Sequence, residues 1–189
     1  MARVRRNIVV EGLAGMLASQ LVFKHDKAGR TIISIKPRFD ENREFTPAQM
    51  AQQERFQEAT AYAKDAIQTE AVYAEKAVGT AMSAYNVAVA DWFHTPEVTE
   101  IDVSNYTGQE GQVIRARVMD DVQVTRVTMV ITTDAGEVVE QGEMTHEQGV
   151  WYTYTTVDTC PDGPARVIVT GLDLPGHAGV EEATLTATA

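Results

Sequence analysis

Histidine, cysteine and serine are the residue types here that could do catalytic chemistry, and their spacing argues against it. The four histidines, His25, His94, His146 and His177, lie in four different segments, and none has a second ligand at HExxH or CxxC spacing. Cys160 is the only cysteine, so no intramolecular disulfide can form. The chain also has no Gly-x-Ser-x-Gly elbow and no phosphate-binding loop. We expect no enzyme, no catalytic residue and no cofactor, although a Ser–His pair brought together only by the fold stays open.

Three aspartates could bind a cation. Asp120 and Asp121 follow one predicted strand, and Asp173 follows another that would end at the same pole of a β-sandwich. Carboxylate oxygens at such a pole are suitable ligands for Ca²⁺. Aspartates in turns also accept hydrogen bonds from local backbone amides, and we favour that interpretation. The prediction is therefore no metal, with the calcium site as the alternative.

Charge is distributed unevenly along the chain, whose formal net charge is -11. Residues 97–189 contain 16 acids and 4 bases, a net charge of -12, whereas residues 1–39 contain 8 bases and 2 acids, a net charge of +6. An acidic half would repel a polyanion, and the aromatic residues needed to stack single-stranded bases are missing, so we expect no nucleic-acid partner. Opposite charges at the two ends favour head-to-tail contact between copies.

The start of the chain is basic, which raises the question of export. Glu11, Gly12 and Gly15 interrupt what would be the apolar core of a signal peptide, so we expect no cleaved signal. The sequence contains no apolar run of about 18 residues or more, so we expect no membrane insertion. Synthesis in the cytoplasm is the expectation, with a place in a cell-surface or virion-like assembly left open.

The elements that must position these residues begin with a helix near residue 47. Its start carries the residues of a capping box, with a first-turn proline, and of a hydrophobic staple. These residues are Thr46, Pro47 and Gln49 for the box, and Phe45 and Met50 for the staple. Apolar residues at helical spacing extend this helix to residue 67, and shorter helices are predicted over residues 70–78 and 81–93.

A β-hairpin is predicted ahead of the helices. Its strands would span residues 20–25 and 30–36, joined by a turn at 26–29, with a short strand at 8–10 and a glycine-rich coil before them. A lone two-stranded hairpin is marginally stable in water. It must therefore pack on the helices or lend its edges to another sheet, which is itself a way of binding a partner.

Beyond Pro96 the composition changes to Val, Thr and Ile with alternating polarity. Seven short strands separated by turn signals predict a β-sandwich. The predicted strands are residues 98–103, 112–119, 125–132, 138–143, 151–157, 166–172 and 182–188. The predicted fold class is α+β in two parts: a basic arm, β-hairpin and about three helices in residues 1–96, then a seven-stranded Ig-like sandwich in residues 97–189.

Two resemblances support this division. The stretch Val113–Val124 (VIRARVMDDVQV), with Asp173 before the Gly176–Gly179 turn, resembles the V-x-A-x-D-D-x-x-V … D-x-x-G pattern of Ig-like modules in bacterial surface and structural proteins. That resemblance covers about half of the chain and implies fold alone. The N-terminal half is similar to short bacterial proteins of no established activity, which implies no catalytic residue. The similar segments are Val22-Phe23, Gly29–Ile32, Lys36-Pro37 and Thr46–Phe56.

These patterns favour a self-assembling structural protein, such as the subunit of a filament, tubule or phage-like particle, with the sandwich displayed outward. Its partners would be other copies of itself. The predicted contact residues are Arg3, Arg5, Arg6, Val22, Phe23, Ile32 and Ile33.

The alternative is an Ig-like adhesin or ligand-binding module for a carbohydrate or a protein. Its N-terminal half would dock it on a larger particle, with other particle proteins or a glycan as partners. The predicted ligand face contains Trp151, Tyr152 and Tyr154. Because side chains alternate along a strand, Trp151 must lie on the opposite face from the two tyrosines, so one set faces outward.

Overall fold

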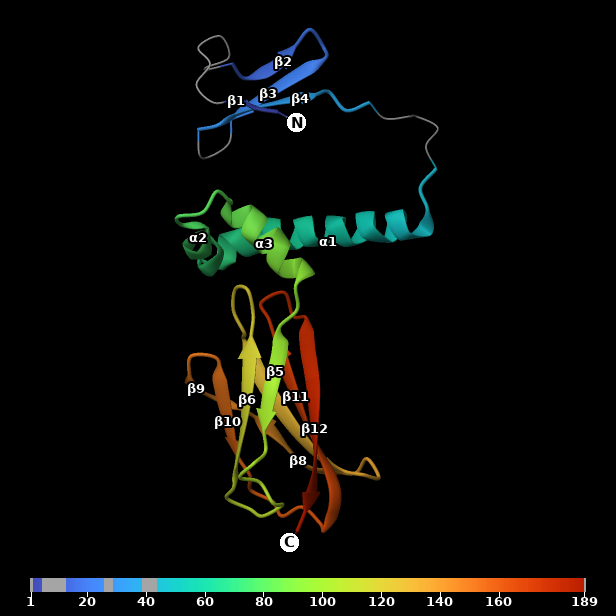
Figure 1. The fold of residues 1–189 in the computed structure, drawn as a ribbon, viewed down its shortest axis with the longest axis vertical. Helices are drawn as coiled ribbons and strands as arrows, with labels where there is room; N and C mark the ends of the chain where they lie inside the picture. The colour runs from blue at the N-terminus through green and yellow to red at the C-terminus, as the bar shows by residue number, and fades with distance from the viewer. Residues whose placement is uncertain (1, 5–12, 26–28, 39–43, 189) are drawn as a thin grey trace. The chain divides into compact units, whose positions relative to one another are not determined.

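The computed structural model describes residues 2–4, 13–25, 29–38 and 44–188. The chain forms two compact units, Met1–Ala88 and Val89–Ala189, and most of their elements are labelled in Figure 1. The boundary therefore lies inside the third helix rather than after residue 96. The reason is that the end of this helix contacts the sandwich, where the Trp92 ring lies 5.1 Å from the ring of His177.

The first unit begins with a four-stranded antiparallel sheet in the order β1-β4-β3-β2. Its strands are β1 (Ala2–Val4), β2 (Gly15–Leu17), β3 (Leu21–His25) and β4 (Thr31–Ile35). Pairing of β3 with β4 confirms the predicted hairpin. The expectation that this hairpin has only two strands is wrong, because β1 pairs with β4 and β2 pairs with β3.

Strand β2 was missed because glycines near it indicate a coil. The chain reverses between β2 and β3 through Ala18 and Ser19, which have left-handed φ angles of 50° and 56°. This tight reversal lets residues 15–17 pair with β3. The strand predicted at residues 8–10 and most of the turn predicted at 26–29 lie outside the described residues.

The helices follow as α1 (Pro47–Thr69), α2 (Val72–Ala77) and α3 (Ala84–Phe93). The capping box is confirmed: Gln49 N donates to Thr46 Oγ1 at 3.3 Å, and Thr46 N donates to Gln49 Oε1 at 3.1 Å. None of the helices in the described ranges is both long and apolar enough to cross a membrane.

Only the C-terminal half of α1 is covered. Ala59, Ala63 and Ala66 are buried at helical spacing, and α2 lies beside this end of α1 in Figure 1. Contact between the two helices includes a hydrogen bond of 2.6 Å between the hydroxyls of Tyr62 and fully buried Tyr73. Every residue from 47 to 58 is exposed.

The second unit is a β-sandwich of two four-stranded antiparallel sheets, in the orders β5-β6-β10-β9 and β12-β11-β7-β8. Its strands are β5 (Glu97–Asp102), β6 (Val113–Met119), β7 (Arg126–Thr133), β8 (Val138–Glu143), β9 (Thr145–Gln148), β10 (Trp151–Thr155), β11 (Gly163–Leu172) and β12 (Ala178–Ala187). All seven predicted strands are present. The count of seven was wrong because β9, whose four residues are all exposed, carries no alternation that sequence could show.

The alternation predicted for the core is observed. Ile114, Ala116 and Val118 of β6 are fully or almost fully buried, as are Val127, Met129 and Ile131 of β7. Val167 and Val169 of β11 complete the centre of the same cluster. The second unit therefore has a continuous apolar core between its two sheets.

Candidate assembly surface and other candidate sites

An exposed apolar row lies at one end of the N-terminal sheet. Leu17 is opposite Leu21 in the β2–β3 register, and Leu21 is opposite Ile35 in the β3–β4 register. Directly opposed residues share one face of a sheet, so the three side chains form a row across β2, β3 and β4. Leu17 is 55% exposed and Ile35 is 76% exposed. This row, Leu17–Leu21–Ile35, is therefore an apolar surface that the described part of the chain leaves largely uncovered.

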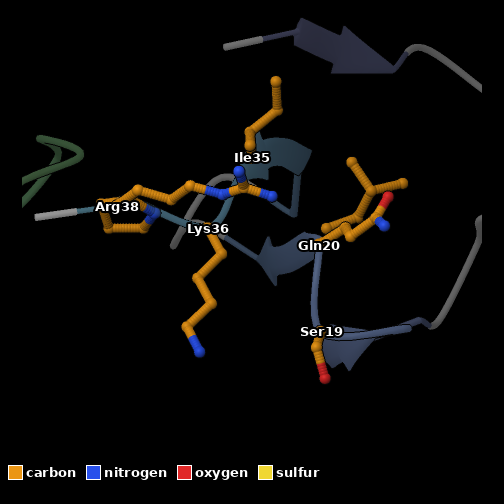
Figure 2. Close-up of a pocket in the computed structure, with 7 residues that line it drawn as sticks. Ser19, Gln20, Ile35, Lys36 and Arg38 are labelled. Carbon is orange, nitrogen blue, oxygen red and sulfur yellow. The ribbon is translucent and has the colours of Figure 1, made fainter.

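A basic cleft adjoins this apolar row. It has a volume of about 370 Å³. Its lining consists of Ser19, Gln20, Leu21, Ile35, Lys36, Pro37 and Arg38. A hydrogen bond of 2.7 Å from Lys36 N to Gln20 O joins its two sides. In Figure 2, Ile35 and Lys36 point in opposite directions, and Arg38 reaches across the cleft.

The two cations of the basic cleft are available for binding. Lys36 and Arg38 are both exposed, and neither forms a salt bridge with any residue that the structure describes. An apolar wall beside two available cations suits a segment that carries both carboxylates and an apolar side chain.

The contact residues predicted from sequence do not form one surface. Val22 and Ile32 lie on one face of the sheet, and Phe23 and Ile33 lie on the other. Phe23 is buried. Arg3 lies on β1 opposite Ile32 in the register. The predicted contacts at positions 5 and 6 lie outside the described residues. Apolar triplets in sequence cannot show which members share a face until the register is known.

The first turns of α1 also present apolar side chains to solvent. Met50 and Phe56 are exposed on this part of the helix, as is Phe45 just before it. An amphipathic helix normally buries its apolar stripe, and α1 does so only from Ala59 onward. The exposed half of α1 is thus a second candidate contact surface.

The pole of the sandwich holds the three aspartates considered as calcium ligands. Asp120 Oδ2 accepts hydrogen bonds from the backbone amides of Val122 at 2.9 Å and Gln123 at 2.8 Å. Asp173 Oδ1 accepts one from His177 N at 2.6 Å. These are the turn-capping contacts that we favoured. Within the described ranges, no group of three or more His, Cys, Asp or Glu residues is arranged to hold a metal ion.

Asp173 is unusual because its carboxyl group is buried. The residue is 2% exposed, and Oδ2 has no hydrogen-bond partner, with His177 Nδ1 at 3.5 Å. Burial raises the pKa of Asp173, an effect that the hydrogen bond from His177 N partly opposes. The charged form is therefore disfavoured relative to an exposed aspartate.

An open cleft of about 650 Å³ lies at the same pole. It is lined by Phe93, His94, Thr95, Glu97, Met119, Asp120 and Asp121. His94 Nδ1 and Asp121 Oδ2 are 2.5 Å apart, and both side chains are exposed. Three carboxylates line this cleft, so it would favour a cationic ligand over an anionic one.

The three aromatics of the predicted ligand face are divided by the sheet. Tyr152 and Tyr154 pack against the core, and Tyr154 donates a hydrogen bond of 2.6 Å to Glu140. Burial, with the carboxylate of Glu140, raises the pKa of Tyr154 to about 12. Trp151 is on the outer face, where the Arg115 guanidinium lies 4.9 Å from its ring centroid. Trp151 is therefore the outward-facing member.

Cys160 and the serines of the described ranges do not show the contacts of an activated nucleophile. Cys160 is fully buried, and burial raises the pKa of its thiol, so the nucleophilic thiolate is scarce near neutral pH. No serine hydroxyl forms a hydrogen bond with a histidine ring within the described ranges. The open question of a Ser–His pair therefore finds no support in these contacts.

No protein-family model and no curated protein sequence matches the chain. Solved structures similar to it include CopC from Methylosinus trichosporium OB3b, at 15% identity over 50% of this chain and 93% of that chain, with a TM-score of 0.38. Another is the tetra-tandem repeat in the extending region of a large adhesion protein, at 25% identity over 49% of this chain and 23% of that chain, with a TM-score of 0.36. A third is FN3tt, at 14% identity over 50% of this chain and 96% of that chain, with a TM-score of 0.32.

These similarities cover about half of the chain and transfer no activity. The two-sheet Ig-like architecture of the second unit rests on its own strand pairing. The similarity of the N-terminal half to short bacterial proteins stays a prediction.

Proposed function

We propose that the chain is a non-enzymatic structural subunit that assembles with copies of itself through its first unit. One observation carries this proposal. Of the fourteen large apolar residues that are exposed in the described ranges, ten lie before residue 89. Among these residues, Leu17 and Ile35 belong to the continuous row Leu17–Leu21–Ile35, and contiguous exposed apolar surface on a folded protein marks an interaction site.

The contrast between the two cores supports this proposal. Among the described residues of the first unit, the buried apolar ones are Phe23, Ala59, Ala63, Ala66, Tyr73 and Ala88. Four of these six are alanines, so these described residues remove little apolar area from water. The sandwich, by comparison, buries large side chains from both of its sheets. A unit with so small a core gains stability when a partner covers its exposed surfaces.

Charge indicates how copies would meet. Residues 1–39 carry a net charge of +6 and residues 97–189 a net charge of -12. A contact between these two unlike surfaces is heterologous, so repeating it produces a ring or an open filament. A filament, a tubule or the shell of a particle would each satisfy that geometry.

Size in solution tests the proposal. Multi-angle light scattering and sedimentation velocity of the full chain should show a mass that rises with concentration and falls with added salt, because salt screens exposed charges. Negative-stain microscopy should show rings or filaments at low salt. A monomer at high concentration and low salt would refute self-assembly.

The alternative is an Ig-like module that binds a carbohydrate or a protein. Outward-facing Trp151 and the open cleft at the sandwich pole favour this alternative. A glycan array tests it, with Trp151→Ala as the variant and Val138→Ala, an exposed position on the sandwich, as the control. Binding that is lost only in Trp151→Ala would support the module.

A further inference from the structure

Strand β12 forms an edge of the sandwich with an unusual surface. It pairs with β11 along all ten of its residues and is the last strand of its sheet. Val180 is 58% exposed, and Glu181 and Glu182 beside it are exposed. Neither glutamate forms a salt bridge with a described residue. The segment Val180–Glu182 therefore presents one apolar and two anionic side chains at an accessible edge.

The charges on this edge limit what can bind there. Glutamates on an edge strand repel the same strand of another copy, which discourages pairing of β12 with β12. A basic partner reverses the sign of that interaction, so the edge discriminates between partners by charge.

The basic cleft of the first unit has matching chemistry. Leu21 and Ile35 provide an apolar wall, and Lys36 and Arg38 provide two cations without a described salt-bridge partner. Its volume of about 370 Å³ suits the side chains of a short segment rather than a whole domain.

We propose that the basic cleft of one copy receives the segment Val180–Glu182 of a second copy. Val180 packs against the apolar wall, and the two glutamates pair with Lys36 and Arg38. This inference rests on the proposed self-assembly and names the contact that produces it. The two surfaces differ, so a bound pair of copies still presents one free cleft and one free edge, as an extending assembly requires.

Reversal of charge on each side tests the contact. The variants are Lys36→Glu/Arg38→Glu in the cleft and Glu181→Lys/Glu182→Lys on β12. Two ion pairs become two repulsive pairs in either variant, so the apparent Kd should rise roughly 30-fold, which corresponds to about 2 kcal/mol. All four side chains are exposed, so the thermal unfolding midpoint should match that of the wild type.

Mixing the two variants is the decisive measurement. Near the wild-type Kd neither variant should assemble alone, whereas an equimolar mixture should form at least heterodimers, because the wild-type edge of the cleft variant meets the wild-type cleft of the β12 variant. A control, Lys24→Glu/Lys64→Glu, changes the net charge equally at exposed positions outside the cleft and should assemble as the wild type does. Sedimentation velocity at low salt measures these four samples and the wild type, and circular dichroism checks that each is folded.

The failures are distinguishable. A wild type that stays monomeric refutes self-assembly itself. Assembly that persists in the cleft variant leaves self-assembly standing and overturns the cleft as its contact. Loss of assembly in the cleft variant without recovery on mixing overturns β12 as the occupant and points to another acidic segment or to a different acidic protein.

Discussion

Removal of the exposed apolar row is the perturbation that most directly tests assembly through the first unit. The variant Leu17→Ser/Ile35→Ser replaces its two most exposed members. Leu17 is 55% exposed and Ile35 is 76% exposed. Together they offer a partner an apolar area equal to that of about 1.3 fully exposed side chains. Full burial of one such side chain contributes about 1.5–3 kcal/mol, so a contact that covers both gains about 2–4 kcal/mol from them.

That free energy converts to a measurable change in affinity. Each 1.4 kcal/mol corresponds to about a tenfold change in Kd, so the variant should assemble about 30- to 600-fold more weakly. Sedimentation velocity over a concentration series measures this shift. The variant should unfold at nearly the same temperature as the wild type, because both side chains are largely exposed in the free chain.

A matched control separates assembly from general solubility. The variant Val138→Ser/Val157→Ser removes two valines on the sandwich that are 60% and 66% exposed, a similar amount of apolar surface. It should assemble as the wild type does. The reasoning is refuted if the Leu17→Ser/Ile35→Ser variant keeps wild-type affinity, or if both variants lose affinity equally.

Three further predictions concern the sandwich and are measured by urea denaturation. Tyr154→Phe removes a hydrogen bond of 2.6 Å to buried Glu140 and should lower the free energy of unfolding by about 1.5–3 kcal/mol. An unchanged free energy of unfolding would contradict that bond. The stability difference between Asp173→Asn and the wild type should favour the variant more at pH 7 than at pH 4. Burial raises the pKa of Asp173 above 3.8, so the folded wild type holds the proton more tightly than the unfolded chain does. The wild type therefore loses stability as the pH rises through the pKa of the folded state. Gly179→Ala should destabilise by about 1–3 kcal/mol or more, because its Cβ would overlap the backbone oxygen of Pro96; a wild-type midpoint would contradict that packing.

Sequence was most informative where local signals are strong. The capping box at Thr46 and Gln49 predicted the start of α1 to the residue, because these signals act within one helical turn. Alternation of apolar and polar residues predicted seven strands of the sandwich and the inward face of β6. The favoured reading of Asp120 and Asp173 as turn caps also agrees with their hydrogen bonds, because such contacts reach only a few residues along the chain.

What sequence could not determine depends on register and on partners distant in the chain. Leu17, Leu21 and Ile35 form one row only because three strands pair in a particular alignment, and the opposite faces of Val22 and Phe23 follow from the same alignment. A shift of one residue would exchange the two faces of a strand. The short exposed strand β9 and the position of Trp151 on the outer face likewise required the sheet.

The distribution of charged residues along the sequence by itself determined that a basic N-terminal segment precedes an acidic C-terminal half. Tertiary structure alone decided that two cations of that start, Lys36 and Arg38, meet Leu21 and Ile35 in one cleft. The physical reason is that charge adds up along a chain without regard to folding, whereas a binding surface exists only where separate strands bring their side chains together.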